Sequence, residues 1–228
     1  MARLPRLVVP GLPHHVVLQG HGDEPLFIDD IDRTIFRGLL RELAGPHGVA
    51  IHAYALLGSE VQLLLSPNGT ADLGRFVQAI GRRYVRAFNT RHSRQGGLWR
   101  ARFQSTVLEP QRWLLACMQY IEWQPVRAAL VSEPQHYGWS SFAHHAGISL
   151  DPLVSDHSAF WALGNTPYER QSAYRERFDR PLDAEEIGSL ERATRHGWAL
   201  GSPAFIDSLT RISGRRPSPR RPGRPRKI

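Results

Sequence analysis

Three residues near the middle of the chain have the types and spacing to act on a phosphate. Tyr120 and Gln124 are four positions apart, so they share one face of a helix, and Arg127 follows closely. A tyrosine can serve as a covalent nucleophile, and an arginine is well suited to binding phosphate. Pro125 should end the helix near Trp123 or Gln124, because it lacks a backbone donor and disfavours helix in the preceding residue. The alternative is that Tyr120 is a core residue of an amphipathic helix.

The stretch of residues 120–128 resembles the tyrosine helix of REP-associated tyrosine transposases, which are relatives of the single-tyrosine transposases. The resemblance extends over roughly residues 6–177. It implies that Tyr120 attacks a DNA phosphodiester and becomes linked to a 5′-phosphate. It also implies that Gln124 lies beside a metal ion. The family usually has Leu-Asn where this chain has Trp123 and Gln124.

The same resemblance indicates where that metal would bind. The family carries a His-hydrophobic-His triplet on a central strand, and this chain has Glu60-Val61-Gln62 there. Because alternate strand residues point to the same face, Glu60 and Gln62 still project together. With Gln124 they offer oxygen donors, which suit Mg²⁺ or Mn²⁺. Two alternatives remain open: a weak, altered Mg²⁺ or Mn²⁺ site, or a site that has decayed or been put to another use.

The other histidines give no second metal cluster by their spacing. His14 and His15 are adjacent in a predicted strand and point to opposite faces, so both cannot serve one site. We expect His15 to be structural or to face DNA. His144, His145 and His157 lie outside the family motifs and lack the close spacing of a structural zinc site.

The elements that must position these residues follow the order β-α-β-β-α-β, and then the tyrosine helix. This order predicts an α+β fold of the ferredoxin-like type, an antiparallel sheet with helices on one face. The single-tyrosine transposases, by resemblance, share this plan. Apolar periodicity predicts strands over residues 14–19, 49–57, 61–66 and 103–108, and helices over 31–43, 73–88 and from Pro110 onward.

We expect three regions along the chain. Residues 1–150 should form the transposase-like domain, residues 151–212 a helical extension, and residues 213–228 a disordered tail rich in Arg, Pro and Gly. The extension contains no recognisable catalytic motif. Its predicted helices cover residues 158–164, 167–178, 184–196 and 203–212.

The positive charge of the chain is localised. The formal net charge is 29 − 21 = +8, and residues 211–228 carry eight positive charges and no acid. The rest of the chain is therefore formally neutral, and the tail indicates a polyanionic partner. The tail residues expected to contact DNA are Arg221, Arg224, Arg226 and Lys227.

A second basic stretch contains no acid between Asp72 and Glu109. Its arginines alternate with aromatic residues, a combination that suits phosphates and unpaired bases. An ordinary solvated helix face is the alternative, but uncompensated charge repels itself without a partner. The arginines expected to bind DNA here are Arg75, Arg82, Arg83, Arg86, Arg100 and Arg102, together with Arg127.

The resemblance implies a transposase-like protein that binds a DNA hairpin flanked by single strand, such as a palindromic repeat. It would cleave and rejoin strands through Tyr120, and a homodimer is a further expectation. The rival hypothesis is a DNA-binding protein that descends from such a transposase and has impaired catalysis. An RNA-binding protein is a third reading, although the aromatic strand motif of such proteins is missing. No apolar run predicts a signal peptide or membrane span, so we expect a cytoplasmic protein.

Overall fold

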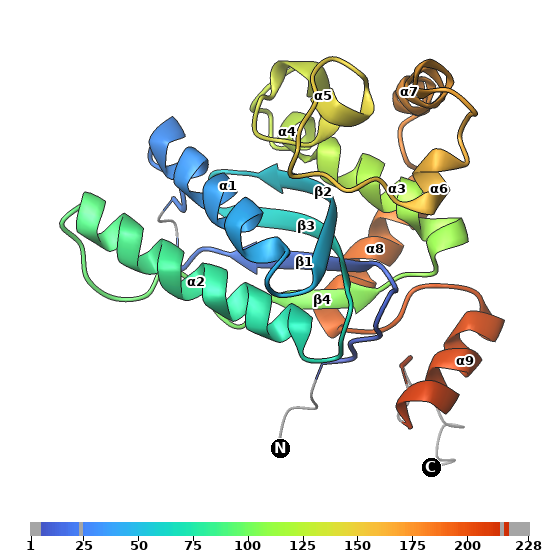
Figure 1. Cartoon of the computed structure of the whole chain (residues 1–228), viewed down its shortest axis with the longest axis horizontal. Coiled ribbons are helices and arrows are strands. Elements are labelled where there is room, and N and C mark those ends of the chain that lie inside the picture. Colours follow the sequence, from blue (N-terminus) through green and yellow to red (C-terminus); the bar gives the residue numbers. More distant parts are fainter. Residues whose placement is uncertain (1–5, 23–24, 215–216, 219–228) are drawn as a thin grey trace, which may run out of the picture.

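A four-stranded antiparallel sheet forms the centre of the computed structural model, which describes residues 6–22, 25–214 and 217–218 (Figure 1). The strand order is β2-β3-β1-β4, which is the ferredoxin-like order predicted from the sequence of elements. The strands are β1 (His14–Gln19), β2 (Val49–Leu56), β3 (Glu60–Pro67) and β4 (Gln104–Val107).

One face of the sheet is covered by α1 (Asp30–Ala44) and α2 (Asp72–Arg91) (Figure 1). The Asp29 side chain caps α1 by accepting hydrogen bonds from two backbone amides of its first turn. Apolar side chains of both helices and the sheet form the largest core cluster, which includes Phe36, Leu63, Phe76 and Tyr84.

The opposite face is covered by α3 (Pro110–Glu122) and α8 (Ala184–His196) (Figure 1). Strand alternation separates the two faces: Leu63 packs toward α1 and α2, whereas Leu64 packs against α3. Glu60 and Gln62 share a face with Leu64 and therefore point toward α3 and α8. The sequence predicted helices on one face of the sheet, and α1 and α2 occupy that face. The additional helices α3 and α8 bury the second face.

The tyrosine helix ends as the proline predicts. Helix α3 stops at Glu122, and a single turn, α4 (Gln124–Arg127), follows. Pro125 lies at the start of α4, where its missing N–H would have no helical partner. The predicted terminus near Trp123 is confirmed.

The extension does not have a core of its own. Phe160, Tyr174 and Leu190 pack in the same cluster as Leu114 and Ile121 of α3. Gly197 ends α8 in the left-handed conformation, at φ 69°, which glycine adopts without strain. The remaining helical elements are η1 (Pro134–His136), α5 (Phe142–His145), α6 (Ser158–Trp161), α7 (Pro167–Glu176), η2 (Arg177–Asp179) and α9 (Pro203–Ser213).

A buried carboxylate fastens the tyrosine helix to the extension. Glu122 is fully buried and accepts hydrogen bonds from Tyr174 (2.7 Å), Ser141 (2.5 Å) and His145 (2.7 Å). These three donors satisfy a charge that would otherwise be costly to bury. In the part of the chain that the structure describes, no helix is long and apolar enough to cross a membrane.

Candidate tyrosine site and nucleic-acid surface

Tyr120 lines a cavity of about 630 Å³ between the sheet and helices α3 and α8. The structure brings together here the four residues that the sequence suggested for catalysis and metal binding. Strand β3 supplies Glu60 and Gln62 from alternate positions, α3 supplies Tyr120, and α4 supplies Gln124. The Tyr120 side chain is mostly enclosed, because the whole residue is 6% exposed.

His15 links the metal-site positions to α8. Its ring nitrogens contact Thr194 Oγ1 at 2.8 Å and Gln62 Oε1 at 3.2 Å, and Gln62 donates in turn to Glu60 at 2.6 Å. Burial lowers the pKa of His15 to about 4, so the ring is neutral at physiological pH. A neutral ring that donates to the Gln62 carbonyl must accept from Thr194. The hydrogen bonds therefore run in one direction, from Thr194 through His15 and Gln62 to Glu60.

This chain of hydrogen bonds bears on the divalent metal that the sequence resemblance implies for this site. The Gln62 oxygen, which would be a metal ligand, accepts from His15 instead. Glu60 is then the only charged group among the three predicted ligands, and it accepts from the Gln62 amide. Mg²⁺ requires near-octahedral coordination by hard oxygen ligands. As they are arranged in the structure, Glu60, Gln62 and Gln124 do not fit such a metal ion.

The phenol of Tyr120 faces an acid from the extension. Tyr120 Oη lies 3.4 Å from Glu191 Oε1, and Arg127 binds the same oxygen at 3.0 Å. Burial raises the pKa of Tyr120 to about 12, and the charge of Glu191 adds to that effect, whereas Arg127 and Gln124 oppose it. The phenol is thus fully protonated at neutral pH and is a weak nucleophile in this state.

Replacing Glu191 with Gln is expected to lower the pKa of Tyr120 below about 12, because the negative charge nearest the phenol is removed while Arg127 stays. Titration of tyrosine labelled with ¹³C at Cζ, with Tyr120→Phe used for assignment, measures the shift. Glu185→Gln on the same helix is the matched control and should leave the pKa unchanged. If Glu191→Gln and Glu185→Gln titrate alike, Glu191 does not act on the phenol.

Among the lining residues of this cavity that were not predicted as site residues, His15, Glu191 and Thr194 make the hydrogen bonds described above. Glu191 and Thr194 are three positions apart, so they lie on one face of α8. That spacing was the feature of the sequence that could have indicated that both residues belong to one site. Nothing local indicated that this face of α8 packs over the tyrosine. His15 was expected to be structural or to face DNA, and the structure places it inside the cavity with its ring edge-on to Tyr120.

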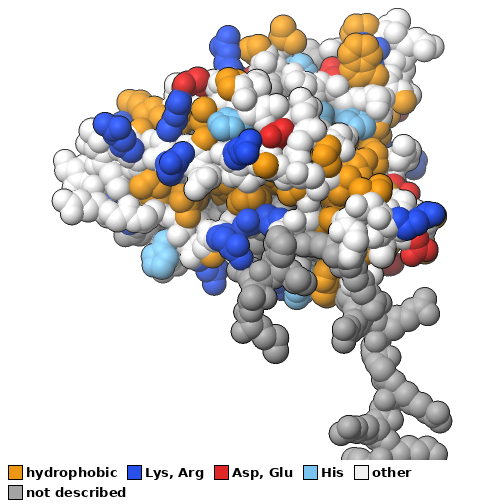
Figure 2. Space-filling model, turned by 60° about the horizontal axis from the view of Figure 1, so that its bottom comes forward, with side chains coloured by type: hydrophobic (Ala, Val, Ile, Leu, Met, Phe, Trp, Pro, Cys, Tyr) orange, Lys and Arg blue, Asp and Glu red, His pale blue; other side chains and the backbone are white. Residues whose placement is uncertain are grey.

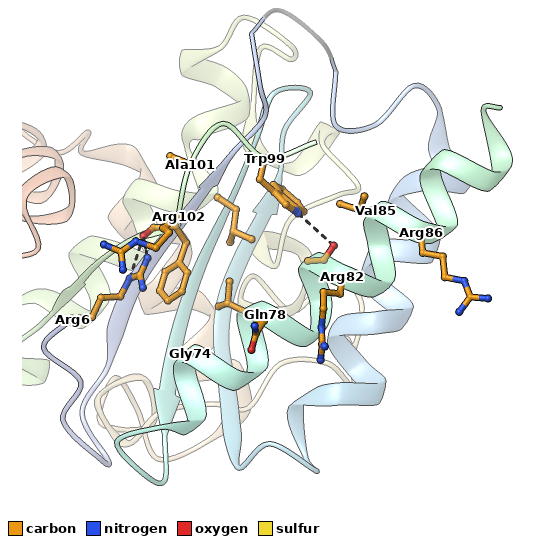
Figure 3. Close-up of a pocket in the computed structure, with 13 residues that line it drawn as sticks. Arg6, Gly74, Gln78, Arg82, Val85, Arg86, Trp99, Ala101 and Arg102 are labelled. Atoms are coloured by element: carbon orange, nitrogen blue, oxygen red, sulfur yellow. Dashed lines mark hydrogen bonds between the residues drawn. The ribbon is translucent and has the colours of Figure 1, made fainter. Parts of the chain in front are cut away.

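A second cavity, of about 660 Å³, lies between α2 and the segment before β4 (Figure 3). Trp99 lines this cavity and donates from its indole nitrogen to the Gly81 carbonyl. Figure 3 shows Arg82 and Arg86 on the α2 side of the cavity, and Arg6 and Arg102 on the opposite side. No acidic residue lines this cavity among the residues that the structure describes. The lining also includes Leu18, Val77, Val85 and Phe103.

The two cavities meet at the edge of the sheet. Ala101 lines both of them, whereas Arg100 lines only the tyrosine cavity and Arg102 only the second cavity. The two arginines thus lie on either side of a bend in the chain at residues 100–102. A strand of nucleic acid that follows this edge meets positive charge on both sides.

The predicted DNA-binding arginines fall into three groups. Arg83 pairs with Glu42 and Arg127 with Glu191, so acids from other elements neutralise two of them, contrary to the expectation of uncompensated charge. The four tail positions, Arg221, Arg224, Arg226 and Lys227, lie outside the described residues. The third group comprises the predicted arginines that are exposed and have no ion pair among the residues described: Arg75, Arg82, Arg86, Arg100 and Arg102.

Figure 2 shows basic side chains spread over one face of the molecule, with hydrophobic surface between them. That combination suits a polyanion that also carries flat apolar groups, as single-stranded nucleic acid does.

Comparison with solved structures identifies the architecture. A REP-associated tyrosine transposase bound to a REP hairpin superposes with a TM-score of 0.57 at 17% sequence identity, over 70% of this chain and 96% of that one. The chain has the fold of that transposase. A second structure, a transposase-like protein from Deinococcus radiodurans R1, covers 54% of this chain and 98% of its own at 25% identity, with a TM-score of 0.37. No family model and no curated protein matches the sequence.

Proposed function

We propose that this chain is a transposase-like protein that binds hairpin or single-stranded DNA. The observation that carries the proposal is that two adjoining cavities are lined by exposed arginines without an ion pair among the described residues, namely Arg82, Arg86, Arg100 and Arg102. The solved transposase of the same fold holds a REP hairpin. A hairpin with a single-stranded flank is therefore the first ligand to test, and a palindromic repeat is its natural form.

The chemistry of the surface supports a flexible strand as the ligand. Arg82 and Arg86 lie four positions apart on α2 and can hold neighbouring phosphates. Trp99 and Phe103 present partly exposed rings beside them, and aromatic rings stack on unpaired bases. Arg6 lies 3.5 Å from the centre of the Phe103 ring, so one side of that ring is already covered.

Fluorescence anisotropy with labelled oligonucleotides tests the proposal. The chain should bind a DNA hairpin with a single-stranded flank more tightly than a blunt duplex of the same length, with affinity that falls as salt rises. An RNA hairpin of the same sequence serves as the comparison for the RNA-binding alternative. If the DNA hairpin, the blunt duplex and the RNA hairpin bind with equal affinity, the chain binds polyanions nonspecifically, and the proposal is contradicted.

Arg82→Ala and Arg86→Ala are each expected to reduce the slope of log K against log salt by about 0.7, the value for one phosphate contact to a single strand. Affinity should fall alike for hairpins of different sequence, because backbone contacts carry no sequence information. Arg83→Ala is the matched control on the same helix, and its effect should be smaller because Glu42 already pairs with Arg83. A loss with Arg83→Ala as large as with Arg82→Ala would reject this assignment.

Strand cleavage by Tyr120 is the second candidate function, and the grouping of Tyr120, Glu60, Gln62 and Gln124 in one cavity favours it. Tyr120 Oη would attack phosphorus, forming a phosphotyrosyl bond as the bond to the 3′ oxygen breaks. Glu191 would accept the phenolic proton, and the leaving 3′ oxygen would take a proton from water. We infer that this reaction is slow or absent in the native chain for two reasons. The phenol of Tyr120 is protonated, and Gln62 is engaged in hydrogen bonds with His15 and Glu60 instead of being free to bind a metal ion.

A further inference from the structure

A histidine pair outside the tyrosine cavity meets an acid that is distant in sequence. His144 and His145 end α5, and the turn that leads toward α6 brings back Asp156. His144 Nε2 lies 3.2 Å from Asp156 Oδ1, and His145 Nε2 lies 3.9 Å from the same oxygen. One ligand atom from each residue lies within 4.8 Å of the other two. This corrects the expectation of no second cluster, since sequence spacing does not reveal how the intervening loop folds back.

His145 presents an unpaired lone pair toward this acid. Its side chain is fully buried, and its Nδ1 donates to Glu122 Oε1 at 2.7 Å. When the ring is neutral, that hydrogen bond leaves the lone pair on Nε2, a buried atom with no hydrogen-bond partner among the described residues. The lone pair of the neutral ring and the Asp156 carboxylate are both acceptors, so they repel unless a proton or a metal cation lies between them. A histidine backed by a carboxylate in this way is the usual support of a metal ligand.

We propose that His144, His145 and Asp156 bind a divalent transition-metal ion, with Zn²⁺ as the metal that this ligand set suits best. Two imidazoles and one carboxylate favour zinc over Mg²⁺ or Ca²⁺. Ligand atoms around a tetrahedral zinc are about 3.3 Å apart, from metal–ligand distances of about 2.0 Å. The 3.2 Å separation already matches this spacing, whereas His145 must move closer to Asp156 than 3.9 Å, and the two imidazoles, whose ligand atoms lie within 4.8 Å of each other, must approach in the same way.

The fourth coordination position faces a cavity of about 360 Å³ that His144 and Asp156 line. The side chains of these two residues are 11% and 27% exposed, so an ion can enter and water can complete the coordination. In the metal-free state His144 Nδ1 accepts from the Asp151 amide at 3.1 Å, so its proton lies on Nε2. Binding through Nε2 moves that proton to Nδ1 and breaks the contact with Asp151. His145 and Asp156 therefore contribute more of the affinity than His144.

The proposed ion would join the extension to the tyrosine helix. Glu122, which orients His145, belongs to α3 two positions after Tyr120. Metal binding would hold the turn between α5 and α6 against the end of that helix. The site is separate from the tyrosine cavity and does not depend on DNA binding or cleavage.

Zinc binding to the full chain, purified without a polyhistidine tag and stripped with a chelator, tests the proposal. Competition with a chromogenic chelator should show one tight Zn²⁺ site per chain, and Co²⁺ in its place should give the visible absorption of a tetrahedral complex. Asp156→Asn keeps the shape of a partly exposed side chain and should lower the affinity by at least about 10-fold, as even loss of a supporting group does. His144→Gln should lower it less.

Two control variants and a melting curve separate this site from adventitious binding. His136→Gln and Asp207→Asn alter exposed residues outside the cluster and should leave zinc affinity unchanged. Zinc should raise the melting temperature of the native chain and of both controls by the same amount, and that of Asp156→Asn by less. Absence of a tight site in the native chain, or zinc binding by Asp156→Asn equal to that of the controls, would overturn the proposal.

Discussion

Replacing Glu60 and Gln62 together by histidine is expected to raise Mn²⁺-dependent cleavage of hairpin DNA by about 100- to 1000-fold over the native chain. A metal that polarises the phosphate supplies several kcal/mol of transition-state stabilisation, and each 1.4 kcal/mol is about tenfold in rate. Strand β3 already directs both positions into the cavity of Tyr120. The substitution also removes the Gln62 amide that bonds to His15 and Glu60.

A covalent adduct between labelled hairpin DNA and the protein, resolved on a denaturing gel, measures this restored activity. The triple variant that adds Tyr120→Phe must lose the adduct, because no phenol remains to attack phosphorus. Glu60→Ala with Gln62→Ala is the matched control that opens the cavity without supplying ligands. If the histidine variant folds and binds DNA but forms no adduct, Tyr120 is not placed for attack. Rapid metal-dependent cleavage by the native chain would instead show that Glu60 and Gln62 already hold a metal.

Deleting residues 219–228 is expected to reduce the salt slope of DNA binding by up to about 3.5, or about 0.7 for each of the five basic residues removed. The loss of affinity should be largest at low salt and shrink as salt rises, since released counterions drive this part of binding. The cut is placed after residue 218 because the Pro217 carbonyl accepts a hydrogen bond from the Ala199 amide. Truncation there leaves the described part of the chain intact.

A full-length variant in which the same five basic residues are replaced by Gln is the control for tail length. It should behave like the truncation, because charge and not chain length produces the effect. The arginines of α2 should then account for most of the remaining salt dependence. An unchanged salt slope in both variants would exclude the tail from DNA binding.

The boundaries of the main elements were set by local signals and could be predicted from the sequence. The strand predicted over residues 14–19 and the helix predicted over residues 184–196 match β1 and α8 of the structure. Pro125 predicted the end of α3 because proline has no backbone N–H to donate to a helical carbonyl. The order of strands and helices then led to the sheet order, because few topologies join these elements by short connections.

The grouping of Tyr120 with Glu60 and Gln62 was predictable only through the resemblance to the transposases. The alternation of side chains along a strand predicts that Glu60 and Gln62 share a face of the sheet, but it does not predict which helix covers that face. The ion pairs of the arginines could not be predicted from the sequence either. Arg82 and Arg83 are adjacent in the sequence, and Arg83 forms an ion pair with Glu42 because α1 packs against α2.

Tertiary structure alone decided what surrounds the reactive groups. Glu191 reaches Tyr120, and Thr194 reaches His15, because α8 packs across the second face of the sheet, far along the chain from β1 and α3. Asp156 reaches His145 because a loop returns to α5. Apolar periodicity and capping residues act over a few residues of the chain. They therefore determine where a helix or strand begins and ends and which of its faces is apolar. Which polar faces meet depends on how all elements bury their apolar sides at once, and that is settled only when the chain packs.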